Sequence, residues 1–368
     1  MRRAGLGARV LAVGGCLVAA AGCDSALPPP EPTVTVEAPD GFGPMPVPTA
    51  TPLTVARVDL GERLFFDPML SRDRSVSCAS CHLPELAFSD GRPVSTGVDG
   101  RTGFRNAPGL LNVGYERALF HDGGALFLET QALVPLEDPN EMDLAPEDAV
   151  ARLAAHAEYP ALFRAAFGEG PTVQTMARAL AAFQRTLVSA PVAWDRYRAG
   201  DADALAPTAR AGEALFQTHC ASCHAGPRLT SGAFENNGAA TDDSGRARIT
   251  GDPADTGRFR VASLRAVART APYFHDGRFA TLAEVVAHYD RGGDGTPGQS
   301  PAVRPLHLTQ PEREALVAFL ATFTDTAASP HRGGVPRPTA APHRTLRAAG
   351  DGGVPRPTAA PLPGLPAR

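Results

Sequence analysis

Three shortages in the sequence limit what this protein can be. Its net charge at pH 7 is only −4 over 368 residues, so neither nucleic acid nor an anionic membrane surface is expected as its main partner. Beyond residue 21, no apolar stretch reaches the roughly 18 residues that a membrane-spanning helix needs. Only five methionines occur and the last is Met176. The C-terminal half therefore has no thioether side chain that could bind a metal ion.

Against this background, the sequence Cys-Ala-Ser-Cys-His occurs twice, at residues 78–82 and 220–224. A Cys-x-x-Cys-His motif is typical of covalent haem attachment. The thiols of Cys78 and Cys81, and those of Cys220 and Cys223, would bond to two porphyrins. His82 and His224 would each be an axial ligand to iron. The motifs therefore predict two covalent haem c groups.

Two other interpretations of the cysteines are weaker. A four-cysteine zinc site usually keeps its pairs within about 15–20 residues, whereas these pairs lie far apart in the chain. A thiol redox motif does not require the histidine that follows both pairs. Haem attachment is the interpretation that uses every residue of the motif.

The N-terminus has the pattern of an export signal over residues 1–23. Two arginines precede an apolar run from Val10 to Ala21, and Ala-Ala-Gly-Cys at residues 20–23 resembles a bacterial lipobox. We expect Cys23 to carry a lipid anchor; ordinary signal cleavage nearby is the alternative. The predicted location is periplasmic or in the cell envelope, which suits c-type haem because it is attached outside the bacterial cytoplasm.

Between two low-complexity segments lies a helical body. Residues 24–53 are rich in Pro and Thr and predict a flexible tether, and residues 328–368 contain a repeated Pro-rich decapeptide and predict a disordered tail. Apolar residues at helical spacing predict helices over residues 54–66, 146–167, 172–188, 208–216, 281–290 and 311–323. Capping boxes at Thr281 and Thr309 support two of these helices. No alternating strand pattern appears, so the fold class is mainly α.

The body contains an internal repeat. A Gly-Glu-x-Leu-Phe segment precedes each haem motif, at residues 61–65 and 212–216, and a Phe-His-Asp-Gly segment follows each, at residues 120–123 and 274–277. The repeat predicts two tandem c-type cytochrome domains, over residues 54–193 and 194–327. Each domain would wrap around one covalent haem.

The sixth ligand of the second haem can be approached by elimination. No methionine follows residues 220–224, and the remaining candidates are His275, His288, Tyr289 and His307. In the helix predicted from Thr281, Tyr289 falls on the apolar stripe and His288 on the polar side. We therefore expect Tyr289 to point inward and His288 outward; a core tyrosine with a bonded hydroxyl is the alternative.

These motifs together resemble the bacterial di-haem cytochrome c peroxidases, including their methylamine-utilisation G (MauG) branch. The resemblance covers about residues 54–325 and rests on both haem motifs, residues 64–68, 105–108 and 270–277, Gln131, Pro135 and residues 140–142. It implies a peroxidatic first haem, an electron-transfer second haem, Glu141 and Gln131 as catalytic residues, and Tyr289 as the second haem's ligand. It also implies one Ca2+, bound by Asn106, Thr270 and Pro272.

The chain departs from the family pattern in two places. His121 stands where the family usually has a tryptophan between the haems, and the single tryptophan is Trp194. Residues 83–104 contain no histidine. The histidine that occupies the open coordination position of the first haem iron in many family members is therefore missing. We therefore expect a first haem that needs no reductive activation, as in MauG.

The resemblance implies an H2O2-dependent oxidoreductase of one of two kinds. One kind reduces peroxide with electrons from a small cytochrome or cupredoxin, and the other oxidises a residue of a partner protein, as MauG does. Tyr289 and the missing histidine favour the second kind. The alternative from a different class is a non-catalytic di-haem electron-transfer cytochrome. Family members are often dimers, so a homodimer is one expected arrangement.

Overall fold

The computed structural model describes residues 31–324. The export signal, the lipid-anchor residue Cys23 and the repeated tail lie outside the described residues. Among the helices that are described, none combines the length and apolar character required to cross a membrane.

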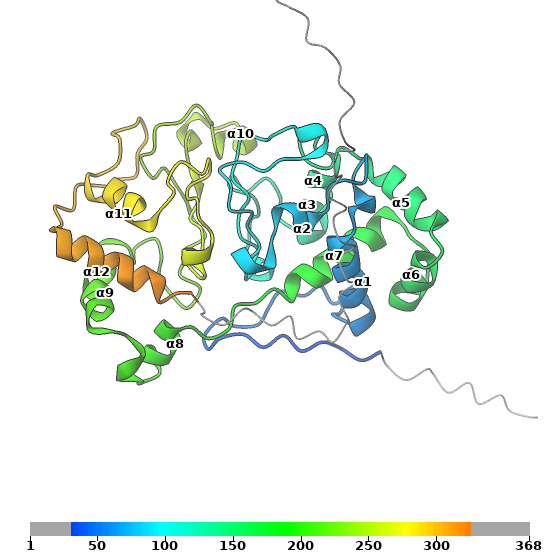
Figure 1. The fold of residues 1–368 in the computed structure, drawn as a ribbon, viewed down its shortest axis with the longest axis horizontal. Helices are drawn as coiled ribbons and strands as arrows, with labels where there is room; N and C mark the ends of the chain where they lie inside the picture. The colour runs from blue at the N-terminus through cyan, green and yellow to red at the C-terminus, as the bar shows by residue number, and fades with distance from the viewer. Residues whose placement is uncertain (1–30, 325–368) are drawn as a thin grey trace, which may run out of the picture.

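Two α-helical domains lie side by side, each with long loops (Figure 1). The α-helices of the first are α1 (Val55–Phe66), α2 (Cys78–Cys81), α3 (Leu128–Gln131), α4 (Val134–Glu137), α5 (Pro146–Ala155), α6 (Tyr159–Phe167) and α7 (Val173–Arg185). Those of the second are α8 (Ala193–Arg198), α9 (Pro207–His219), α10 (Ala247–Thr250), α11 (Leu282–Asp290) and α12 (Gln310–Ala321). Strands β1 (Phe234–Glu235) and β2 (Phe259–Arg260) form one antiparallel pair.

Short 3-10 turns connect these elements, at Pro68–Leu70, Pro84–Leu86, Val98–Gly100, Val113–Tyr115, Ala202–Ala204, Pro253–Asp255 and Val267–Arg269. The mainly α fold with two tandem cytochrome c domains is therefore as predicted.

The internal repeat appears as the same helix crossing in both domains. Gly61 of α1 lies so close to α7 that a Cβ atom there would be 1.9 Å from the carbonyl oxygen of Ala179. Gly212 of α9 lies equally close to α12, with 2.0 Å from a Cβ to the carbonyl oxygen of Ala315. Only glycine permits such an approach, so each Gly-Glu-x-Leu-Phe segment provides the helix contact beneath one haem motif.

The predicted helices agree with the structure except at one break. The predicted helix over residues 146–167 is two helices, α5 and α6, because the chain leaves the helical conformation between Ala155 and Tyr159. Pro160 is the second residue of α6, in the first turn, where its missing N–H carries no penalty. The capping boxes at Thr281 and Thr309 are confirmed. The short helix α8 was not predicted.

The Pro-rich segment before α1 is not a free tether in its described part. Residues 31–53, here called the strap, run along both domains (Figure 1). Phe42 is buried edge-on against Tyr115 of the first domain, at 5.3 Å between ring centroids. The Arg265 guanidinium of the second domain lies 4.7 Å from the same ring. Phe42 therefore anchors the strap to both domains, so residues 31–53 are not free along their whole length, and a tether over residues 24–53 stays a prediction.

Buried ion pairs join the two domains. Arg105 of the first domain contacts Asp122 of the same domain at 2.6 Å and Asp243 of the second domain at 2.7 Å. Arg248 of the second domain reaches the same Asp122 at 3.0 Å. Burial would raise the pKa of Asp122, but the hydrogen bond and charge of Arg105, with the charge of Arg248, lower it overall. Asp122 is therefore held as a carboxylate although only 1% of its side chain is exposed.

We predict that Arg105→Met lowers the free energy of unfolding by about 3 kcal/mol, because it leaves two buried carboxylates without their main partner. The matched control is Arg248→Met, which removes an arginine from the same Asp122 but from a half-exposed position. Its cost should stay below about 1 kcal/mol. Urea unfolding of the two holoprotein variants measures both values; equal costs would contradict this account of the junction.

Candidate haem centres

The first haem motif begins a short helix whose geometry fits haem attachment. Cys78 and Cys81 lie at the two ends of α2, and neither forms a disulfide. His82 follows, and its Nδ1 bonds to the carbonyl oxygen of Phe88 at 2.7 Å. This hydrogen bond fixes the imidazole and leaves Nε2 available to a metal. Burial, the largest effect, lowers the pKa of His82, which favours the neutral form that ligates iron.

Glu141 faces this motif from a tightly bonded loop. The carbonyl oxygen of Glu141 accepts a hydrogen bond from the N–H of Val98 at 2.8 Å. Surrounding protein raises the pKa of its carboxyl to about 7, and the charge of Asp138 adds to the effect. Burial is the main cause that raises the pKa values of the Cys78 and Cys81 thiols. The negative charge of Glu141 raises both pKa values further. Glu141 therefore combines proximity to the first haem motif with a proton held near neutral pH.

The acidic residues around Glu141 divide between two environments. Asp143 forms ion pairs with Arg72 and Arg101 at the surface, at 2.8 and 2.5 Å. Glu137 is exposed at the end of α4. The pKa of Glu141 is raised by burial, whereas hydrogen bonds and the charges of the two arginines lower the pKa of Asp143. Gln131 ends α3, immediately before α4, so it belongs to the same α3–α4 unit that carries the Glu141 loop.

The second haem motif opens into a large cavity. His224 Nδ1 bonds to the carbonyl oxygen of Leu229 at 3.1 Å, which repeats the arrangement at His82. Cys220, Cys223, His224 and Tyr289 all line one cavity of about 330 Å³ between α11 and the domain junction. A covalent haem requires this combination of two thiols, an oriented imidazole and an apolar chamber, so the residues fit the group.

Tyr289 is the ligand candidate that the cavity favours. Its phenol bonds to the Asn237 side chain, and its pKa is raised by burial and by the nearby thiols of Cys220 and Cys223. His307 is exposed to solvent. His275 also lines the cavity, but its ring stacks on Phe259 at 3.8 Å and its Nε2 bonds to Thr241. Tyr289 therefore shares the cavity with the thiols of Cys220 and Cys223 and interacts electrostatically with both.

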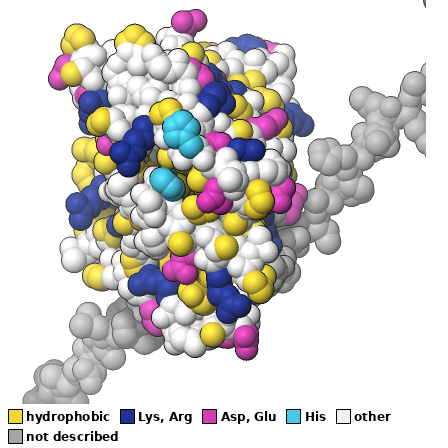
Figure 2. Space-filling view, turned by 90° about the vertical axis from the view of Figure 1, so that its left-hand side faces the viewer, with side chains coloured by type: hydrophobic (Ala, Val, Ile, Leu, Met, Phe, Trp, Pro, Cys, Tyr) yellow, Lys and Arg dark blue, Asp and Glu magenta, His cyan; other side chains and the backbone are white. Residues whose placement is uncertain are grey.

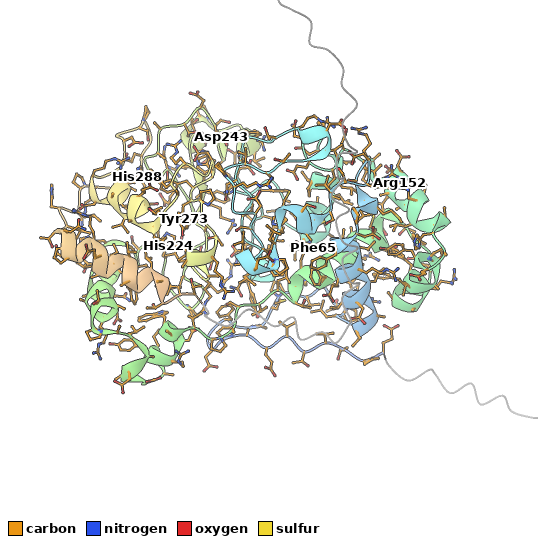
Figure 3. The ribbon with its side chains drawn as sticks, in the orientation of Figure 1. Phe65, Arg152, His224, Asp243, Tyr273 and His288 are labelled. Atoms are coloured by element: carbon orange, nitrogen blue, oxygen red, sulfur yellow. The ribbon has the colours of Figure 1, made fainter. Side chains whose placement is uncertain are left out.

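The prediction that His288 points outward is wrong. His288 is 0% exposed, and its Nε2 bonds to the carbonyl oxygen of Asn237 at 2.9 Å. Its Nδ1 lies 3.0 Å from Arg291 and 3.8 Å from Asp294. Figure 3 labels His288 on α11. The segment that contains Asn237 covers His288, although the preceding residue of α11, Ala287, is exposed. Asn237, which contacts Tyr289 and His288, was missed, and no periodic pattern marks it.

The three residues assigned to Ca2+ come together at the junction. Asn106, Thr270 and Pro272 line the same cavity wall. The Asn106 amide nitrogen donates to the carbonyl oxygen of Arg92 at 2.7 Å, which leaves its Oδ1 facing away from that bond. Side-chain and carbonyl oxygens are the ligands that Ca2+ prefers, so the donor set fits.

His121, which replaces the expected tryptophan, is part of the same junction. Its Nε2 bonds to the Asn106 carbonyl oxygen at 2.9 Å, and the Asn106 N–H donates to the carbonyl oxygen of His275 at 2.7 Å. The two histidines of the repeated Phe-His-Asp-Gly segments are thus connected through one residue. This continuous chain of hydrogen bonds crosses from the first domain to the second.

Comparisons with known proteins agree with this geometry. The family described as di-haem cytochrome c peroxidase matches residues 55–203, and the cytochrome c family matches residues 209–324. The methylamine utilization protein MauG of Methylorubrum extorquens is 41% identical, over 76% of this chain and 81% of that protein. Cytochrome-c peroxidase IdrP1 of Denitromonas iodatirespirans is 36% identical, over 77% of this chain and 85% of that protein.

A solved structure extends the likeness to the fold. A MauG-like protein associated with microbial copper homeostasis has a TM-score of 0.76 and 34% identity, covering 80% of this chain and 97% of that one. This chain therefore carries its two haem motifs and its buried inter-domain junction on a fold that it shares with that protein. The chain belongs to the family of di-haem cytochrome c peroxidases and MauG proteins, and it is a peroxide-dependent oxidoreductase with two covalent haems.

Proposed function

We propose that this enzyme reduces H2O2 at the haem held by Cys78, Cys81 and His82, and uses the oxidising equivalents to oxidise an aromatic residue of a partner protein. Glu141 and Gln131 act on the peroxide side of that haem. Tyr289 ligates the second haem, held by Cys220, Cys223 and His224. The observation that carries the proposal is the raised pKa of Glu141 beside the first haem motif.

Glu141 has the properties of a proton shuttle. With a pKa of about 7, its carboxyl is close to half ionised at neutral pH. The ionised form accepts a proton from one oxygen of H2O2, and the protonated form returns it to the departing oxygen as water. The bound haem supplies the iron that exchanges electrons with peroxide. Gln131 on the neighbouring helix offers an uncharged amide that orients the peroxide without competing for its proton.

The second haem supports oxidation of a protein over simple electron entry. A tyrosinate is a hard, anionic ligand, whereas the thioether of methionine raises haem potential and suits electron uptake. The described cavity provides Tyr289 and no methionine. The chemistry therefore favours a MauG-like reaction, in which the partner protein loses electrons to the haem pair. A small cytochrome or cupredoxin as electron donor is the second candidate partner.

One Ca2+ at the domain junction belongs to the same proposal. Asn106 Oδ1 and the carbonyl oxygens of Thr270 and Pro272 would bind it, with water completing the shell. The ion would lie where Asn106 also connects His121 to His275. Binding there would stiffen the region between the two haem centres.

We further propose export to the periplasm or cell envelope, with a lipid anchor at Cys23. Covalent haem and the pattern of residues 1–23 support it. The face of the second domain seen in Figure 2 carries mixed positive and negative side chains, which suits an aqueous compartment and a protein partner. A homodimer remains part of the proposal through the family likeness.

We predict that Glu141→Gln lowers peroxide turnover by roughly 10²–10⁴-fold, because glutamine cannot carry the proton. In the wild type, kcat/KM should rise with pH through about 7 and level off above it, since the ionised carboxylate is the acceptor. Glu137→Gln, an exposed change on the neighbouring helix, is the control and should leave both unchanged. A wild-type rate for Glu141→Gln would end the assignment.

Tyr289→Phe should convert the second haem from low spin to high spin, because phenylalanine offers no ligand atom. Absorption and EPR spectra of the ferric protein measure this directly. Tyr273→Phe is the matched control: Tyr273 lines the same cavity, but its hydroxyl donates to the carbonyl oxygen of Val267. An unchanged spectrum in Tyr289→Phe would show that another residue is the ligand.

Dialysis against a calcium chelator should release one Ca2+ per chain and change the spectra of both haems, because the site joins the two domains. Adding Ca2+ back should restore them and Mg2+ should not, since Mg2+ demands a tighter octahedral shell. Metal analysis before and after dialysis tests the site. Protein that contains no calcium, or spectra indifferent to its removal, would count against it.

A further inference from the structure

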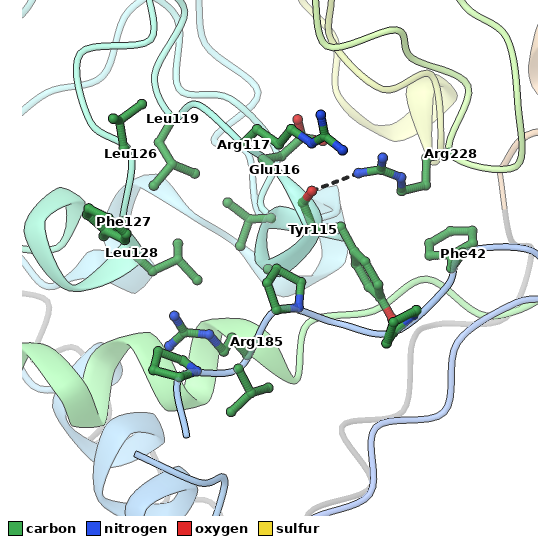
Figure 4. A pocket seen from close by; sticks show the side chains of 16 residues that line it. Phe42, Tyr115, Glu116, Arg117, Leu119, Leu126, Phe127, Leu128, Arg185 and Arg228 are labelled. Carbon is green, nitrogen blue, oxygen red and sulfur yellow. Dashed lines mark hydrogen bonds between the residues drawn. The ribbon is translucent and has the colours of Figure 1, made fainter. Parts of the chain in front are cut away.

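A second cavity, of about 690 Å³, lies between the strap and the first domain and has no part in the proposed reaction (Figure 4). We call it the strap pocket. Its lining comes from the strap, from the segment around Tyr115, from the start of α3, and from two arginines. The residues are Phe42, Pro44, Pro46, Val47, Pro48, Val113, Gly114, Tyr115, Glu116, Arg117, Leu119, Leu126, Phe127, Leu128, Arg185 and Arg228.

One wall of the strap pocket is stiff. Pro44, Pro46 and Pro48 alternate along the strap and all three line the pocket. Successive side chains of an extended backbone point to opposite sides, so alternate prolines share one face. Proline has fixed φ and loses little entropy on binding. The wall is therefore preorganised for the flat face of a ligand, which reduces the entropic cost of binding.

The opposite wall carries aromatic and apolar side chains, two of which are largely exposed to solvent. Leu126 is 61% exposed and Phe127 is 65% exposed, and both line the pocket. Tyr115 lies deeper, with its ring buried against Phe42. Large apolar side chains exposed together beside a cavity are typical of a binding site. Aromatic rings opposite prolines favour a flat aromatic ligand.

Positive charge in the pocket is not balanced. Arg228 donates to the backbone oxygen of Tyr115 at 2.7 Å and has no carboxylate partner among the described residues (Figure 4). Arg117 is exposed and has no hydrogen bond or ion pair within residues 31–324. The one acidic lining residue, Glu116, is already paired with Arg260 at 2.8 Å. Two cations are thus available to an anionic group.

The strap pocket also adjoins the second haem centre. Val113 and Glu116 line both this pocket and the cavity that contains His224 and Tyr289. A molecule in the strap pocket would therefore be separated from that cavity by a single layer of side chains. This position makes the pocket a site from which a ligand could influence, or be influenced by, the second haem.

We propose that the strap pocket binds a small aromatic carboxylate. The ring would lie between the proline wall and the side chains of Tyr115 and Phe127. The carboxylate would face Arg117 and Arg228, whose guanidinium groups match its planar shape. Binding needs neither peroxide nor Glu141, so it can be tested independently of the proposed reaction.

Equilibrium dialysis of the full-length holoprotein with 2-naphthoate tests the proposal, and uncharged 2-naphthamide is the matched probe. Naphthoate should bind saturably and about tenfold more tightly than naphthamide. Arg117→Gln should weaken naphthoate about fivefold and leave naphthamide unchanged. Phe127→Ser should weaken both probes. Because Arg117 and Phe127 are exposed, neither change should impair folding.

Arg164→Gln, an exposed arginine on α6 outside the pocket lining, is the control for the loss of one charge and should bind naphthoate as the wild type does. Equal affinity for the two probes would overturn the proposal, as would an effect of Arg164→Gln equal to that of Arg117→Gln. Absence of saturable binding by both probes would overturn it as well.

Discussion

Arg105 holds carboxylates of both haem domains at once, and the relative position of the two haem centres depends on this contact. It forms two hydrogen bonds with Asp243 of the second domain and one with Asp122 of the first. Its guanidinium also lies near the rings of Phe104 and Phe259. A buried charge without its partner is costly, so rotation of one domain against the other is opposed by desolvation as well as by lost bonds. An enzyme that passes electrons between two haems needs such a fixed separation.

The two domains share a framework and differ where chemistry requires it. Gly61 and Gly212 allow the same close helix crossing, and His82 and His224 donate to equivalent backbone oxygens. The first domain adds the Glu141 loop, whose carboxyl has a raised pKa and is the proton carrier that we propose. The second instead adds Tyr289 on α11, a potential iron ligand. Under the proposed function, one copy of the duplicated cytochrome c unit would react with peroxide and the other would hold part of the oxidising equivalents. The strap and the ion pairs at the junction bind these halves together.

Local patterns predicted what depends on local interactions. The spacing of Cys220, Cys223 and His224 identified haem chemistry, and the boxes at Thr281 and Thr309 located two helix starts. Contacts between distant segments were not predictable. The burial of His288 depends on the backbone of Asn237, which lies 51 positions away. Pro and Thr dominate residues 24–53 and predict a tether, yet the Phe42 ring contacts Tyr115 of the first domain and Arg265 of the second. Composition reports average behaviour and misses such an anchor.

We expect the first haem to react with peroxide while the enzyme is fully oxidised, and both haems to share the oxidising equivalents. EPR and absorption spectra of the diferric holoprotein, before and after one equivalent of H2O2, test it most directly. We predict one high-spin and one low-spin ferric haem at rest, and loss of both ferric signals on addition of peroxide. Two low-spin haems that remain unchanged until the protein is half-reduced would contradict it.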